Sequence, residues 1–210
     1  MSDYLYLLEH ILEMDSIQTI LDVGSRDGLD AIFLCEHFPN ARIISFECHP
    51  DNIKVCAENI ANSNSSDRIT LVPYAVGNEC KKIEFYPYPG NVGASSMFIH
   101  SDKSNRNPIL VDMKTIESVL KELSVESVDI VCMDIQGFEL YALKGMKNYL
   151  ERILYIQTEI YSSNDRTSYI GCPSRNDLLN FLSFYNFMIL AEHPFGVESN
   201  VVLKNMMVRS

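Results

Sequence analysis

The chain has 210 residues, of which 47% are hydrophobic and 21% charged, a composition typical of a globular protein with a buried core rather than a disordered one. Its formal net charge of −11, from 28 acidic and 17 basic residues, disfavours nucleic acid or an acidic membrane surface as a partner. The six cysteines show no paired or zinc-binding spacing, so we expect reduced thiols and a cytoplasmic protein.

Residues 1–15 form an apolar stretch that acidic residues interrupt, and no basic segment precedes it. This pattern predicts an amphipathic N-terminal helix rather than a signal peptide or a membrane span.

After this helix, short apolar runs alternate with amphipathic segments. Strands are expected at 18–23, 41–47, 68–76, 109–113, 128–135, 152–160, 187–193 and 200–208, with an added edge strand at 81–88. Helices are expected at 27–38, 51–62, 114–123, 138–151 and 174–185. No helix separates the last two strands, which indicates an antiparallel hairpin. The prediction is therefore one α/β domain over 1–210: a doubly wound, mostly parallel seven-stranded Rossmann-like sheet with a C-terminal antiparallel hairpin and helices on both faces.

Residues 89–108 are rich in Gly, Ser, Asn and Pro and predict a long loop. Loops of this length in a compact domain are commonly functional, so we expect an active-site loop that orders over a bound ligand.

The stretch "ILDVGSRDGLDAIF", residues 20–33, predicts a strand, a glycine-containing turn and a helix, which is a common nucleotide-binding arrangement. Three carboxylates, Asp22, Asp27 and Asp30, crowd this turn, and the third glycine of a pyrophosphate-binding motif is missing. Carboxylates repel phosphate but suit a cation. S-adenosylmethionine (SAM) carries a sulfonium cation and no phosphate, so it fits the turn better than NAD. Alternatively, Asp27 caps the helix and Asp22 satisfies backbone donors.

The second predicted strand ends at Glu47, the position from which an acidic side chain usually binds the two ribose hydroxyls of a nucleoside. The cofactor-binding residues expected from the strand ends and turns are Asp22, Gly24, Ser25, Asp27, Gly28, Glu47, Cys48, Ala75, Val76 and Ser95.

Asp134 and Glu159 close two neighbouring predicted strands, so both should lie at the carboxyl edge of the sheet. They can deprotonate an acceptor, bind its hydroxyls or hold a divalent cation such as Mg²⁺; the alternative is a helix cap and a solvent-facing side chain. His193, after another predicted strand, is a candidate catalytic base, and His100 in the loop is a further one.

Several other side chains are candidates for contacting the acceptor. Ser95 and Ser96 can line it, or can belong to a solvated loop. The aromatic residues Phe85, Tyr86 and Tyr88 can stack on a sugar ring or pack in the protein, and Arg166 and Arg175 can bind an anionic acceptor or face solvent.

Six segments follow one another in the order seen in the FkbM family of SAM-dependent methyltransferases, which the chain resembles over about residues 18–160. They are "ILDVGSRDG", "ISFECHPDN", "LVPYAVGN", "GASSM", "TIESVL" and "VDIVCMDIQGFELYALKGM". Two residues depart from the family motif K-I-D-V-E-G: Met133 replaces Lys and Gln136 replaces Glu.

The resemblance implies a class I methyltransferase fold and, most often, O-methylation of a hydroxyl on a sugar or sugar-bearing metabolite. We therefore expect a small-molecule or glycan acceptor. Because of the two departures, a SAM- or nucleoside-binding module without catalysis remains an alternative. An NAD-dependent oxidoreductase is another, and the acidic turn speaks against it.

Overall fold

The computed structural model describes residues 10–11, 14–104, 107–161 and 168–208. The predicted N-terminal helix over 1–15 lies almost entirely outside these residues; Met14–Ser16 form a short 3-10 helix, η1. All six cysteines are free thiols.

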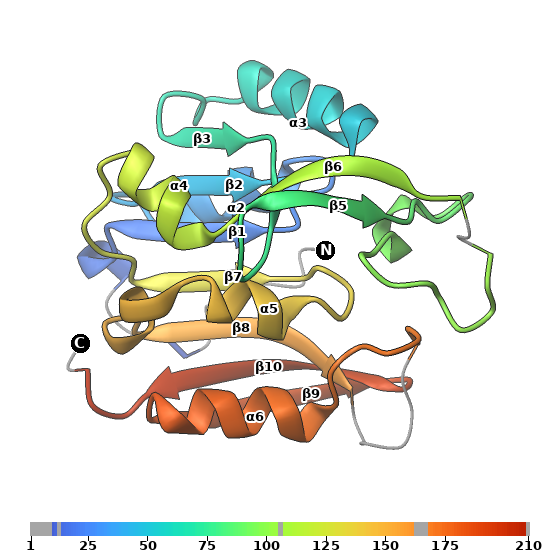
Figure 1. Ribbon diagram of the computed structural model, residues 1–210. Helices are drawn as coiled ribbons and strands as arrows, with labels where there is room; N and C mark the ends of the chain where they lie inside the picture. Colours follow the sequence, from blue (N-terminus) through green and yellow to red (C-terminus); the bar gives the residue numbers. More distant parts are fainter. Residues whose placement is uncertain (1–9, 12–13, 105–106, 162–167, 209–210) are drawn as a thin grey trace.

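The main sheet has seven strands in the order β3-β2-β1-β7-β8-β10-β9 (Figure 1). Its strands are β1 (Thr19–Val23), β2 (Arg42–Phe46), β3 (Ile69–Val72), β7 (Ile130–Met133), β8 (Tyr155–Tyr161), β9 (Phe187–Phe195) and β10 (Glu198–Asn205). Strands β1, β2, β3, β7 and β8 pair in parallel, whereas β10 pairs antiparallel with both β8 and β9. The predicted doubly wound sheet with its C-terminal antiparallel hairpin is confirmed.

Helices cover both faces of this sheet, as predicted. They are α2 (Leu29–His37), α3 (Pro50–Asn62), α4 (Ile116–Glu122), α5 (Glu139–Lys144) and α6 (Arg175–Phe184), with short 3-10 helices η2 (Val92–Ala94) and η3 (Lys147–Glu151). Successive side chains of a strand point to opposite faces. On β1, Ile20 therefore packs with α2 and α3, and Leu21 packs with α4, α5 and α6.

A second, three-stranded sheet was not predicted. It contains β4 (Ala75–Val76), β6 (Ile109–Lys114) and β5 (Lys81–Phe85), in the order β4-β6-β5. The expectation of one strand over 68–76 was wrong, because the chain turns at Pro73 and Tyr74 and enters this second sheet. Proline has no backbone N–H to donate to a neighbouring strand. Strand β5 is an edge strand, as predicted, but its sheet is the smaller one.

Strand order reverses between β1 and β7, whose carboxyl ends therefore flank the position where ligands bind in open α/β sheets. In Figure 1, the green chain that follows β5 lies beyond these strand ends. Among the described residues, no helix combines the length and hydropathy needed to cross a bilayer.

Candidate active site

A cavity of about 440 Å³ opens at the carboxyl ends of β1, β2, β7 and β8. Residues from the second sheet, from the chain after β5 and from β9 complete its wall. The lining includes Gly24, Arg26, Asp30, Glu47, Cys48, Asn52, Ala75, Val76, Phe85, Ser95, Met97, Met133, Asp134, Gln136, Thr158, Glu159, His193 and Asn200. Most of the residues expected to bind the cofactor therefore line the same cavity as the expected catalytic residues Asp134, Glu159 and His193.

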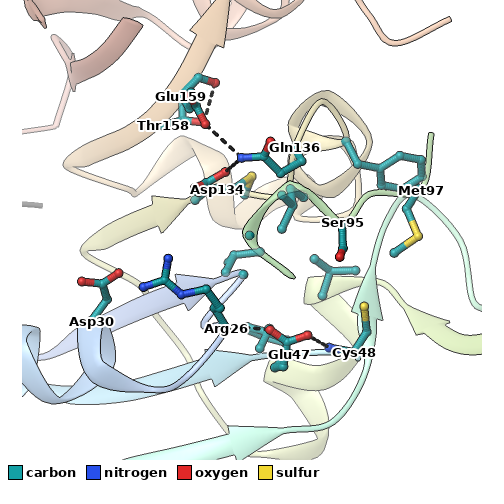
Figure 2. A pocket seen from close by; sticks show the side chains of 18 of the residues that line it. Arg26, Asp30, Glu47, Cys48, Ser95, Met97, Asp134, Gln136, Thr158 and Glu159 are labelled. Atoms are coloured by element: carbon teal, nitrogen blue, oxygen red, sulfur yellow. Dashed lines mark hydrogen bonds between the residues drawn. The ribbon is translucent and has the colours of Figure 1, made fainter. Parts of the chain in front are cut away.

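Glu47 lies in the cavity wall beside β2, where three backbone N–H groups hold its carboxylate. Its Oε2 accepts a hydrogen bond of 2.8 Å from the Arg26 N–H, and its Oε1 accepts bonds of 2.8 and 2.7 Å from the Cys48 and His49 N–H groups (Figure 2). Burial raises the pKa of the Glu47 carboxyl, and these backbone donors counteract the rise because they favour the charged form. The carboxylate is therefore held in one orientation before any ligand binds.

The glycine turn after β1 brings the two halves of the site together. Gly24 has φ +97°, and the N–H groups of Gly24 and Ser25 each donate to the Phe46 carbonyl at 3.0 Å. Gly24 lines the cavity, whereas the buried Ser25 does not.

Three further predicted cofactor residues support this turn from outside the cavity lining. Asp22 is fully buried and accepts a 3.2 Å bond from the Ser45 hydroxyl. Asp27 pairs with the Arg26 guanidinium at 3.4 Å and accepts a 3.2 Å bond from the Leu29 N–H at the start of α2. Gly28 packs against α3. The N-cap of α2 is Gly28 rather than Asp27, and the Ser45 donor to Asp22 is a side-chain hydroxyl rather than a backbone N–H, so these contacts differ from the capping and backbone-bonding roles given as the alternative.

Asp134 and Glu159 meet at the other end of the cavity, and Gln136 lies between them (Figure 2). Gln136 Nε2 donates to Asp134 Oδ1 at 2.6 Å and to Glu159 Oε2 at 3.1 Å. Asp134 follows β7 directly, as expected. Glu159 does not close its strand, because β8 continues to Tyr161 beyond the last residue that pairs with β7, Thr158.

Two carboxyl groups near this end of the cavity, Glu159 and Glu139, have pKa values above the ordinary range. Burial, together with the nearby charges of Asp134 and Glu198, raises the pKa of Glu159 far above its usual range. Glu139, at the start of α5, accepts bonds from the Ile135 and Gly137 N–H groups at 3.0 and 3.2 Å, and burial raises its pKa to about 7. For Glu159, burial and the neighbouring charges both favour the protonated form of the carboxyl.

His193 also lines the cavity, but it lies inside β9 rather than after it, because that strand runs on to Phe195. Ser95 lines the cavity too, and its Oγ accepts a 2.9 Å bond from the Tyr88 N–H. Ser96 is buried and donates through its Oγ to the Gln136 carbonyl at 2.7 Å, so it supports the site without facing it.

The remaining candidates lie away from the cavity lining, apart from Phe85. The His100 Nδ1 atom is 2.9 Å from Asp102 Oδ1, and the Tyr86 hydroxyl donates to Glu84 at 2.6 Å. Arg175 makes a two-pronged pair with Glu192 at 2.9 and 2.8 Å. The Tyr88 N–H donates to the Ser95 hydroxyl within the loop. Arg166 lies outside the described residues.

The cavity chemistry fits SAM. Among the described lining residues, four carboxylates, Asp30, Glu47, Asp134 and Glu159, face one guanidinium and no lysine. This balance suits a cation and opposes a pyrophosphate. A divalent cation has less support, because the described residues contain no group of three His, Cys, Asp or Glu side chains that could hold a metal.

Comparison with known proteins agrees with this geometry. A family model, the methyltransferase FkbM domain, matches residues 22–189. The chain is 31% identical over 199 residues to the 2-O-methyltransferase NoeI of Sinorhizobium fredii, a match that covers 89% of this chain and 79% of NoeI. The chain belongs to the FkbM methyltransferase family.

Two further proteins are similar to the chain at lower sequence identity. The hexuronic acid methyltransferase AglP of Haloferax volcanii is 29% identical over 169 residues, which cover 78% of this chain and 63% of AglP. The crystal structure of methyltransferase FkbM from Methylobacillus flagellatus KT has a TM-score of 0.64 at 17% identity. It is matched over 96% of this chain and 47% of its own length, and shows that the class I methyltransferase fold is shared.

In this FkbM-family chain, the two departures from the motif have distinct places. Counted back from Asp134, the Lys of the motif corresponds to Cys132 rather than Met133, so the expectation for Met133 was wrong; both side chains are buried in β7. Gln136, in place of the Glu, contributes the amide between Asp134 and Glu159. Sequence reasoning noted Gln136 only as a departure, and it missed Asn52, Met97, Thr158 and Tyr169. The available signal for Thr158 was a run of three polar residues, Gln157 to Glu159, inside a predicted strand. Tyr169 is distant in sequence from every motif, so no pattern pointed to it.

Proposed function

We propose that this protein is a SAM-dependent O-methyltransferase that acts on a hydroxyl of a small sugar or glycan acceptor. The observation that carries the proposal is the single cavity with Glu47, fixed by three backbone donors, at one end and the Asp134–Glu159 pair at the other. One end has the chemistry to bind a nucleoside, and the other has the chemistry to bind and deprotonate a hydroxyl.

On the cofactor side, Glu47 would accept hydrogen bonds from the ribose hydroxyls, since its orientation is already set. Gly24 lets the chain after β1 pass close to the ligand, and Cys48, Ala75 and Val76 supply the adjoining wall. When bound, SAM supplies a methyl group on a positively charged sulfur. The carboxylates that line the cavity favour that charge.

On the acceptor side, a sugar hydroxyl becomes a good nucleophile only as it loses its proton. Asp134 is the proposed base, and Glu159, whose protonated form is favoured by burial, is the proposed hydrogen-bond donor to the acceptor. His193 is the second candidate base, because it lines the same cavity. The names of NoeI, a 2-O-methyltransferase, and AglP, a hexuronic acid methyltransferase, support a hydroxyl-bearing sugar as the acceptor.

Calorimetric titration with SAM, S-adenosylhomocysteine and NAD tests the cofactor. We expect both SAM and S-adenosylhomocysteine to bind, and NAD not to. Transfer of radiolabelled methyl groups to a panel of neutral sugars, uronic acids and short glycans tests the reaction. Binding of S-adenosylhomocysteine without transfer to any acceptor would instead support a binding module.

A further inference from the structure

Gln136 adopts an unusual backbone conformation. It follows Asp134 and Ile135 after β7 and has φ +56°, in the left-handed region that residues other than glycine seldom occupy. Such a conformation has to be maintained by surrounding contacts. Here the Ser96 hydroxyl donates to the Gln136 carbonyl at 2.7 Å, so the loop on the opposite side of the cavity stabilises the turn.

The Gln136 side chain makes three hydrogen bonds inside the protein. An amide offers two N–H donors on nitrogen and an acceptor oxygen. Nε2 donates to Asp134 and to Glu159, at 2.6 and 3.1 Å, and Oε1 accepts from the Tyr169 hydroxyl at 2.6 Å. Carboxylate oxygens accept hydrogen bonds, so they select the amide nitrogen, and the oxygen is then left to accept from the Tyr169 hydroxyl.

Tyr169 connects this amide to the loop. Its side chain is only 2% exposed, and its hydroxyl also lies 3.0 Å from the Ala94 carbonyl in η2. The backbone around it pairs with the same loop: the Ser101 N–H donates to the Ser168 carbonyl at 2.7 Å, and the Ile170 N–H to the Ile99 carbonyl at 2.9 Å. The segment around Tyr169 therefore holds both the loop and Gln136.

We propose that Gln136, oriented by Tyr169, is a positioning residue that holds Asp134 and Glu159 as a pair sharing one proton at the acceptor end of the cavity. Two carboxylates bonded to one amide nitrogen repel each other when both are charged, and a shared proton removes that repulsion. In the proposed reaction, on which this role rests, the charged member accepts a proton and the protonated member donates to the acceptor.

Other titratable groups lie around the pair. Glu198 on β10 hydrogen-bonds to the Glu159 carboxyl and favours its protonated form, and Glu139 on α5 favours the same form through its charge. His193 on β9 lines the same cavity, and Tyr161 on β8 lines the adjoining small pocket. Arg175 also lines that pocket, but its guanidinium is bonded to Glu192. The acidic surroundings favour retention of the shared proton, whereas the two Gln136 donors favour the charged form.

Nuclear magnetic resonance of the protein with S-adenosylhomocysteine tests the arrangement without requiring turnover. The side-chain amide signal of Gln136 is assigned by its loss in Gln136→Met. We expect this signal to shift between pH 5 and 9 in the unmodified protein and to lose that shift in Glu159→Gln. Tyr169→Phe removes only a hydroxyl, and it should move the signal and speed its hydrogen exchange about tenfold or more. An unchanged signal in Tyr169→Phe, or one that never titrates, would overturn the proposal.

Kinetics then separates a positioning role from a purely structural one. Gln136→Met should lower kcat about tenfold or more, leave the S-adenosylhomocysteine affinity within about twofold, and move the rising limb of the pH–rate profile to higher pH. The direction follows because the lost donors had favoured the charged form. Tyr185→Phe, at the end of α6 and outside both cavity linings, is the matched control for Tyr169→Phe.

The two proposals can fail separately. If no acceptor is methylated while the Gln136 signal titrates as expected, the proposed function fails and the carboxylate pairing stands. If methyl transfer proceeds and Gln136→Met retains the rate and pH profile of the unmodified protein, the pairing role is overturned and the proposed function stands.

Discussion

The Asp134 carbonyl oxygen lies where Gly24 would carry a side chain: a Cβ atom added to Gly24 would be 1.9 Å from it. The Asp134 N–H donates to the Val23 carbonyl at 3.0 Å, so the ends of β1 and β7 are in direct backbone contact. This contact brings the turn on the cofactor side against the carboxylate on the acceptor side. Position 24 therefore has to be glycine, because any side chain there would collide with the Asp134 backbone.

The first prediction is that Gly24→Ala destabilises the protein and abolishes binding of S-adenosylhomocysteine. The added methyl group forces β1 and β7 apart, and alanine also resists φ +97°. We expect the free energy of unfolding to fall by about 3 kcal/mol or more, as measured by urea denaturation. Gly90→Ala is the control, because Gly90 has φ +77° but open space around its Cβ position, so it should lose only about 1–2 kcal/mol. Equal losses in the two variants would show that backbone strain alone is responsible.

Much of the main sheet could be predicted because its signals are local. The unbroken apolar run ending in Asp134 predicts a central parallel strand, and Pro50 marks the start of α3, where it occupies the first turn. The absence of a helical segment between residues 193 and 200 predicted the terminal hairpin. Glu47 could be placed at the carboxyl end of β2 because the strand before it is short and clearly apolar.

The second sheet and the contact between Gln136 and Tyr169 could not be predicted from local signals. Strand β4 has two residues and pairs with β6, more than thirty residues later, so its pairing depends on tertiary structure. The contact between Tyr169 and Gln136 joins residues 33 positions apart, and the sequence around neither residue indicates it. Strand ends also shifted by one or two residues, which is why His193 and Glu159 lie inside strands.

The second prediction concerns Glu47→Ala. Removal of the carboxylate deprives the ribose hydroxyls of charged acceptors and leaves the N–H groups of Arg26, Cys48 and His49 without this partner. The affinity for S-adenosylhomocysteine should fall at least about tenfold, or roughly 1.5–3 kcal/mol, in calorimetry. Glu36→Ala, on the exposed side of α2, is the control and should bind as the unmodified protein does. Unchanged affinity in Glu47→Ala would remove the ribose assignment.

The third prediction is a pH dependence of stability that arises from Glu139. Its pKa is raised to about 7 in the folded protein, chiefly by burial, from an ordinary value near 4.5. A raised pKa means that the folded state retains a proton that the unfolded state releases, so the contribution of Glu139 to stability is fully present below about pH 4.5 and is lost as the pH rises towards about 7. Glu139→Gln can still accept from Ile135 and Gly137, and it should remove on the order of 2–3 kcal/mol of this decline at most.

Urea denaturation at pH 5 and pH 8 measures this effect. The unmodified protein should lose more stability between the two pH values than Glu139→Gln does, and a residual decline is expected because Glu159 also has a raised pKa. Glu36→Gln, an exposed control, should follow the unmodified protein. The same decline in Glu139→Gln and in the control would mean that Glu139 does not retain its proton.

The fourth prediction concerns the loop after β5. Within the loop, Tyr86 and Ser96 pair through their backbones, and Ser95 bonds to Tyr88. Bonds from Ser96 to Gln136 and from Tyr169 to Ala94 connect the loop to the rest of the protein. Because Val92, Ser95 and Met97 line the cavity, ligand binding should order this segment further. We expect amide hydrogen exchange over residues 89–104 to slow when S-adenosylhomocysteine and an acceptor are bound, while exchange in β1 stays unchanged. Equal exchange with and without ligands would argue against a lid.

The fifth prediction is that Asp134→Asn impairs turnover far more than cofactor binding. Asparagine keeps the shape of the side chain and removes its charge, so the fold and the affinity for S-adenosylhomocysteine should survive. The rate of methyl transfer should fall about a hundredfold or more, because a base acts chiefly in the transition state. Asp112→Asn, which changes an exposed residue of β6, is the control.

If Asp134→Asn loses binding in proportion to activity, Asp134 belongs to the cofactor site; if it loses neither, His193 becomes the better candidate base. Chelator and Mg²⁺ added to the same assay separate direct base catalysis from a metal-ligand role, since only the latter responds to them.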